Sequence, residues 1–151
     1  MSEPLTFFMG KHAAELPADR SYCKNHMWCR PASERFRFGF TSYAIRLMQD
    51  VYLLEWTFDA PRSVALKEEI GFLESSKAQS ALYAPLAGRI ESFNKSLLAD
   101  PSAINADNYG DGWLFEMTAE PTETMDVIGY HDFLTANWEA TQRIIKKQVL
   151  E

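Results

Sequence analysis

Lys77 is the residue whose type and position most directly suggest chemistry. It lies in the segment Glu74-Ser75-Ser76-Lys77-Ala78, between two apolar runs with the pattern of β-strands, so we expect it at the tip of a tight hairpin. There its amine can be a covalent handle for an acylating enzyme, and the small side chains beside it leave clearance. The alternative is a solvated charge on a turn, and the pentapeptide by itself favours that alternative.

Cys23, His26 and Cys29 have the spacing C-x2-H-x2-C, which superficially suggests a metal site. On one unbroken strand, however, the two cysteines would face the same side about 20 Å apart, and His26 would face the other side. This geometry excludes a direct disulfide. It also leaves no obvious fourth zinc ligand, because His12 and His131 lie in unrelated segments. We expect no metal and two inert, half-buried cysteines, with thiol exchange as the alternative.

The elements that must position Lys77 are mostly short strands, because the apolar residues alternate with polar ones or form short runs. Strands are expected at residues 22–30, 35–40, 51–56, 70–74, 82–86, 89–93 and 113–117, the last closing the sheet. Thr41 or Ser42 can cap a short helix that ends at Met48. Residues 94–111 are rich in Asp, Asn and Pro and predict a long loop.

The two ends of the chain have different patterns. Residues 1–20 are expected to be a loosely attached extension, with Phe7 and Phe8 packed onto the body. Near the C-terminus, apolar residues recur with a helical period from about residue 126, namely Tyr130, Leu134, Trp138 and Ile145. We favour a helix that covers an open barrel edge over one that docks a partner.

Composition narrows the class of protein. The 151 residues suffice for one domain with one core, and 46% of them are hydrophobic. A net charge of −6 argues against nucleic-acid binding, which needs a basic face. No apolar run reaches the length of a membrane helix, and the first residues lack the pattern of a signal peptide, so a cytoplasmic location is expected. Short strands with one long helix predict a small β-barrel or sandwich.

Residues 22 to about 134 resemble the H protein of the glycine cleavage system, a member of the biotinyl/lipoyl-carrier fold. Each matching segment is weak alone, but the segments occur in order and at matching spacing. They are His26 and Trp28, Gly39-Phe40-Thr41, Tyr43-Ala44, Glu74-Ser75-Ser76-Lys77-Ala78, Tyr83-Ala84-Pro85, Gly88, Asn94, Leu98, Pro101, Ile104-Asn105 and Asn108-Tyr109-Gly110-Asp111-Gly112-Trp113-Leu114.

The resemblance implies a mainly β fold, a flattened barrel-sandwich hybrid with a short internal helix and a long C-terminal helix. The expected organisation is an extension (1–20), a lipoyl-carrier domain (21–120) and a C-terminal helix packed on it (121–151). Lipoic acid would be attached to Lys77 as N6-lipoyl-lysine, with Glu74, Ser75, Ser76 and Ala78 around it. His26 would line the groove that receives the loaded arm, or would be an ordinary hydrogen-bonded strand histidine. Lipoate is favoured over biotin, whose carriers usually place methionines beside the lysine.

The implied function is that of a carrier, not an enzyme: it shuttles an aminomethyl group and then reducing equivalents. The implied partners are glycine decarboxylase, aminomethyltransferase, dihydrolipoyl dehydrogenase, and a lipoate ligase or lipoyl/octanoyl transferase. Met27 and Ala81 replace residues that are usually acidic in the family, which motivates a second hypothesis. In it, the lipoyl arm carries a sulfur-bound intermediate of sulfur oxidation. A third is a non-carrier binding or regulatory module that retains the fold. Trp56 and residues 36–38 also make the body more aromatic than the family pattern.

Overall fold

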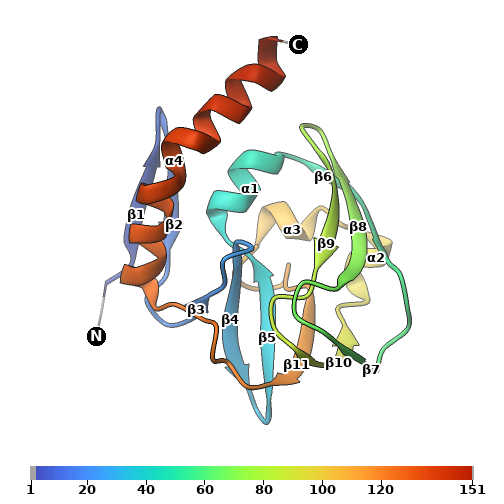
Figure 1. The fold of residues 1–151 in the computed structure, drawn as a ribbon. Coiled ribbons are helices and arrows are strands. Elements are labelled where there is room, and N and C mark those ends of the chain that lie inside the picture. The colour runs from blue at the N-terminus through green and yellow to red at the C-terminus, as the bar shows by residue number, and fades with distance from the viewer. Residues whose placement is uncertain (1–2, 151) are drawn as a thin grey trace.

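The computed structural model describes residues 3–150, with side chains through Arg143, and Figure 1 shows their arrangement. The elements in chain order are β1 (Leu5–Met9), β2 (His12–Leu16), β3 (Ser21–Tyr22), β4 (Met27–Ala32), β5 (Arg35–Phe40), α1 (Ser42–Met48), β6 (Val51–Trp56), β7 (Arg62–Val64), β8 (Glu69–Ser75), β9 (Gln79–Tyr83), β10 (Gly88–Phe93), α2 (Ser96–Ala99), α3 (Ala103–Ala106), β11 (Phe115–Ala119) and α4 (Val127–Leu150). None of the described helices is long and apolar enough to cross a membrane.

The strands pair into three sheets, and all of the pairs are antiparallel. β1 and β2 form a hairpin, six strands follow the order β3-β4-β5-β11-β10-β7, and β6, β8 and β9 form a third sheet. The predicted fold class, mainly β with a short internal helix and a long C-terminal helix, is confirmed. The described strands form separate sheets around a core, as in a sandwich, and not one continuous closed ladder.

The main apolar core joins the six-stranded sheet to the three-stranded one. Phe38, Ile90 and Phe115 come from the first sheet, Ile70 and Leu73 come from β8 in the second, and all five are completely buried. On β10, Ile90 is buried between the more exposed Arg89 and Glu91, whereas on β5 Phe38 begins a run of three buried residues. The core therefore holds β8, which leads directly into the Lys77 turn.

The N-terminal segment is more ordered than the sequence suggests. Residues 5–16 form the β1–β2 hairpin, in which Phe7 and Leu16 are buried in a second apolar cluster with residues of α1 and α4. The prediction of a loosely attached extension is therefore wrong for this hairpin. Only one of the two neighbouring phenylalanines packs onto the body, because successive strand residues face opposite sides and Phe8 is 69% exposed.

The C-terminal helix is confirmed, with the expected start. Asp126 precedes α4, and its carboxylate accepts a hydrogen bond from the backbone N–H of Gly129 at 2.8 Å, as an N-cap residue does. Tyr130 and Leu134 are buried against the N-terminal hairpin and β3, whereas the side chain of Ile145 lies outside the described part. Since β3 is an edge strand of the six-stranded sheet, this part of α4 covers a sheet edge (Figure 1). The sequence favours the same role.

Residues 22–30 do not form one strand. They form a hairpin in which Ser21 pairs with Cys29 and Tyr22 pairs with Trp28. The turn is closed by hydrogen bonds between Cys23 and residues 26 and 27, and His26 has a left-handed φ of 66°. A three-residue loop that ends in a left-handed residue is a common hairpin connection, although glycine usually occupies that position.

The polar stretch 94–111 also differs from the prediction of a plain loop. It contains the one-turn helices α2 and α3, whose Leu97 and Ile104 are buried in the main core. β11 does not close the sheet, because it lies in the interior between β5 and β10. Similarly, β9 ends at Tyr83 and does not run through residues 82–86, where Pro85 lacks a backbone N–H to donate.

Candidate functional site

The predicted hairpin tip is confirmed at the turn between β8 and β9. Glu74 pairs with Gln79, and the backbone N–H of Ser75 donates to the carbonyl of Ala78 at 2.8 Å. The hydroxyl oxygen of Ser75 also accepts the N–H of Ala78 at 3.1 Å, which satisfies a second group of the turn. The turn thus consists of two residues, of which Lys77 is one, and Lys77 is exposed.

Ser76, the other turn residue, fastens the tip to the junction of α1 and β6. Its backbone N–H donates to the carbonyl of Asp50 at 2.9 Å. Its hydroxyl oxygen accepts the N–H of Asp50 at 3.1 Å. Each of the two residues therefore donates one hydrogen bond to the other. This pair of bonds fixes the orientation of the turn relative to the body of the protein.

Asn105 of α3 holds the residues on both sides of Asp50. Its amide nitrogen donates to the carbonyl of Gln49 at 2.6 Å, and its amide oxygen accepts the N–H of Val51 at 2.9 Å. Gln49 has φ 62° and ψ −144°, a conformation that is essentially restricted to glycine. We refer to Gln49, Asp50, Val51, Ser76 and Asn105 together as the tip clamp. It keeps a strained backbone beside the Lys77 turn.

The tip clamp was not predicted as a unit from the sequence. Asn105 belongs to the motif that carries the family resemblance, but its spacing in the chain gives no sign of its partners. Asp50 and Ser76 are 26 positions apart, and Val51 and Asn105 are 54 positions apart. No local signal marks the clamp, because Gln49 occupies the left-handed position after α1, where glycine or asparagine usually follows a helix.

His26 lies apart from the tip, in an aromatic cluster at the β3–β4 turn. Its Nδ1 is 2.9 Å from the hydroxyl of Tyr130, which is also 2.9 Å from the hydroxyl of Thr41. The ring centroid is 4.7 Å from that of Tyr43 and 6.0 Å from that of Phe133. Burial lowers the pKa of His26 to about 4, so the ring is neutral near pH 7. This geometry fits a hydrogen-bonded histidine in a turn better than a group free to meet a mobile arm.

Cys23 and Cys29 are free thiols buried in the main core. Burial raises the pKa of each thiol to about 12. Near pH 7 both therefore remain protonated, and the thiolate needed for exchange or metal binding is disfavoured. This environment supports the inert interpretation of the two residues.

The fold and the tip together define a class of protein: a small β domain that presents one lysine on a rigid, two-residue hairpin turn. The comparisons with known proteins agree with this class. The family model described as glycine cleavage H-protein matches residues 20–136. The chain belongs to the glycine cleavage H-protein family.

Individual relatives cover most of the chain. It is 34% identical over 128 residues to a protein named glycine cleavage system H protein from Coxiella burnetii. This alignment covers 82% of this chain and 98% of the relative. A protein of the same name from Thermus thermophilus is 35% identical over 124 residues, with coverages of 80% and 96%. The crystal structure of a glycine cleavage system H protein from Mycobacterium marinum superposes with a TM-score of 0.68 at 30% identity, covering 81% of this chain and 98% of that one.

Proposed function

We propose that this chain is a lipoyl carrier of the glycine cleavage system, with lipoic acid joined to Lys77 as N6-lipoyl-lysine. The observation that carries the proposal is the position of Lys77, exposed on a two-residue turn, in a chain of this family. Its role would be to carry the reacting group on the lipoyl arm, while partner enzymes perform the catalysis.

The residues at the tip suit such an attachment. The hydroxymethyl of Ser76 and the methyl of Ala78 are small, so they leave the amine open to a modifying enzyme. Ser76 is held to Asp50 on one side, and β8 is anchored in the main core, so the turn keeps one shape for recognition. When attached, lipoic acid would supply a disulfide that can take up an aminomethyl group and two electrons. The chain itself would hold the base of the arm in place.

The proposed partners are glycine decarboxylase, aminomethyltransferase, dihydrolipoyl dehydrogenase and a lipoate ligase or lipoyl/octanoyl transferase, all acting in the cytoplasm. A rigid tip on one small domain suits this role, because several enzymes must receive the same arm in turn. We propose Glu74, Ser75, Ser76 and Ala78 as the immediate surroundings of the attached group. For His26 we propose a structural role, since its Nδ1 contacts Tyr130.

The aminomethyl group is the cargo that we favour. Met27, whose replacement of an acidic residue motivates a sulfur cargo, is 2% exposed and belongs to the main core. A side chain in that position faces apolar neighbours, so its identity gives little information on the charge that the arm meets. Ala81, on β9, is half-buried. Of the two positions, Ala81 alone lies near the surface of the Lys77 hairpin.

Intact-mass measurement after expression with lipoate tests the attachment. Wild-type protein is expected to gain one lipoyl-sized increment, and Lys77→Arg is expected to gain none. Lys67→Arg is the matched control, because Lys67 is also an exposed turn lysine, and it should be modified like the wild type. An unmodified wild type, or an increment that survives Lys77→Arg, would refute the assignment.

The cargo is tested separately with the lipoylated protein. Glycine decarboxylation in the presence of competent partner enzymes should proceed with lipoylated wild type and stop with Lys77→Arg. Lipoylated protein that fails to support this reaction would count against the aminomethyl cargo and favour a different one, without affecting the attachment site.

A further inference from the structure

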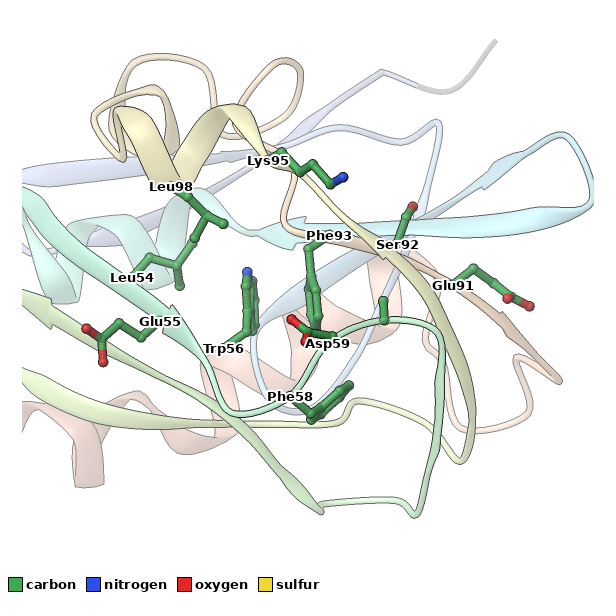
Figure 2. A pocket seen from close by; sticks show the side chains of 11 residues that line it. Leu54, Glu55, Trp56, Phe58, Asp59, Glu91, Ser92, Phe93, Lys95 and Leu98 are labelled. Carbon is green, nitrogen blue, oxygen red and sulfur yellow. The ribbon is translucent and has the colours of Figure 1, made fainter.

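A concave site lies at the end of β6 that is remote from Lys77. β6 begins at Val51, which pairs with Ser75 beside the tip, and ends at Trp56, which pairs with Gly71. Five steps along the extended chain, from Val51 to Trp56, separate the two ends by about 16 Å. The hollow has a volume of about 660 Å³, and its lining includes Glu55, Trp56, Phe58, Asp59, Phe93 and Leu98 (Figure 2).

The wall of this hollow is a fixed aromatic stack. The ring of Trp56 lies 4.4 Å from that of Phe93 between centroids, at 14°, and its edge meets Phe115 at 5.9 Å. Gly71 lies under the indole, because a Cβ there would come within 2.7 Å of the Trp56 ring. Phe58 extends the aromatic surface, with its ring 5.6 Å from Phe93. A flat apolar molecule therefore finds a preformed surface.

The indole Nε1 of Trp56 is buried and has no hydrogen-bond partner among the described residues. An indole N–H can only donate, and a buried donor without an acceptor is rare in proteins and calls for an explanation. In Figure 2 the nitrogen end of the ring points toward the side of the hollow where Leu98 lies. Leu98 is 54% exposed and belongs to the one-turn helix α2, so its side chain can move aside at low cost.

The rim of the hollow is acidic. Glu55 and Asp59 are exposed, and neither takes part in the ion pairs formed among the described side chains. Glu91 adds a third carboxylate, which is already paired with Arg89 at 3.2 Å. Lys95 is the one basic residue in the lining. The balance of charge attracts a cation and repels an anion.

We propose that this hollow binds a small, flat, positively charged organic molecule that carries a carbonyl or another hydrogen-bond acceptor. Its ring would lie against the Trp56 and Phe58 surface, its acceptor would take the N–H of Trp56 after Leu98 moves aside, and its charge would face Asp59, with Glu55 adding negative charge at the outer rim. The volume is within the usual range for small-molecule sites of about 300–1,000 Å³, so a small molecule fits better than a helix or strand of a protein. This site is independent of the attachment proposed at Lys77.

Nuclear magnetic resonance of the four tryptophan indole N–H groups provides the test. The test compound is 4-(aminomethyl)benzamide, which combines a ring, an ammonium and a carbonyl. The controls are 4-carbamoylbenzoate, which keeps the ring and carbonyl but is an anion, and benzylamine, which lacks the carbonyl. The Trp56 signal is assigned as the one lost in Trp56→Phe. Lys77→Arg protein is measured in parallel and should behave as the wild type.

The expected result is a saturable shift of the Trp56 N–H signal with 4-(aminomethyl)benzamide, a weaker one with benzylamine and none with the benzoate. The double variant Glu55→Gln/Asp59→Asn changes only exposed side chains, and it should weaken binding by roughly two- to five-fold per carboxylate removed. Three results would overturn the proposal: no saturable shift at Trp56, equal binding of the anion, or saturable shifts confined to the other tryptophans. If Trp56→Phe fails to fold, the Trp56 signal is identified by sequential assignment of the wild-type protein, and the double variant and the choice of compounds then decide.

Discussion

His26 should make the protein less stable in mild acid, and replacing it by asparagine should remove that sensitivity. The neutral imidazole is enclosed by the rings of Tyr43, Tyr130 and Phe133, and its Nδ1 contacts the hydroxyl of Tyr130. Asparagine suits the exchange, because it tolerates the left-handed φ of 66° at this position and does not titrate.

The size of the effect follows from the difference between the two pKa values. Burial lowers the pKa of His26 from 6.5 to about 4, so the unfolded chain binds the proton first as the pH falls. The stabilising contribution of neutral His26 is thus complete above pH 6.5 and is lost progressively between 6.5 and about 4. A pKa difference of this size corresponds to a contribution of about 3 kcal/mol to the free energy of unfolding, and most of this contribution is lost by a pH of about 4.5.

Urea unfolding of wild type and His26→Asn at pH values of about 7.5 and 4.5 measures this contribution. Between the two conditions, the free energy of unfolding of the wild type should fall by about 2.5 kcal/mol more than that of the variant. Carboxylates protonate in both proteins, so their effect cancels in the difference. Equal losses in the two proteins would refute the reasoning, as would an NMR titration of His26 with its midpoint near 6.5.

Three further substitutions test the tip clamp and the packing of β5. Ser76→Ala removes the acceptor for the N–H of Asp50, a bond that contributes about 0.5–1 kcal/mol, so exchange of that amide should accelerate roughly two- to five-fold. Gln49→Gly should raise the free energy of unfolding by about 1 kcal/mol, measured in urea, because it relieves a left-handed backbone. Gly39→Ala should lower it by at least about 2 kcal/mol, since the added Cβ would lie 2.6 Å from ring atoms of Trp28.

Controls separate these effects from general ones. Ser80→Ala changes a serine on the same hairpin whose hydroxyl bonds only to the neighbouring Ala81 carbonyl, so the exchange rate at Asp50 should stay unchanged. In Gly10→Ala the added Cβ would have no atom within 4 Å, but the backbone at this position has φ +66°. The expected loss of about 1 kcal/mol in the free energy of unfolding therefore measures the cost of the backbone conformation alone. Unchanged exchange in Ser76→Ala, a less stable Gln49→Gly, or a Gly39→Ala as stable as wild type would each contradict its prediction.

The elements predicted correctly are those whose signals are local. The alternation at residues 35–40 forms β5, and Thr41 caps α1 by accepting the N–H of Ala44. The Lys77 turn also depends on a few adjacent residues, because Ser75 and Ala78 close it with bonds across three positions.

The wrong predictions share a dependence on distant parts of the chain. The prediction for residues 1–20 is a loosely attached extension, yet residues 5–16 form a hairpin, and α1 and α4 complete the cluster that buries Phe7. The strand expected at residues 22–30 is instead a hairpin. Its turn contains His26 in a left-handed conformation, at a position where such hairpins usually have glycine. The helices α2 and α3 depend on Leu97 and Ile104 reaching the main core.

The sequence alone determined the fold class, the family resemblance and the turn that presents Lys77, because short-range periodicity and motif spacing are written directly in the chain. The tertiary structure decided how that turn is held, where His26 and Met27 lie, and that Trp56 has an unpartnered indole N–H beside a hollow. These features depend on contacts between residues that are distant in sequence, and those contacts exist only once the chain has folded.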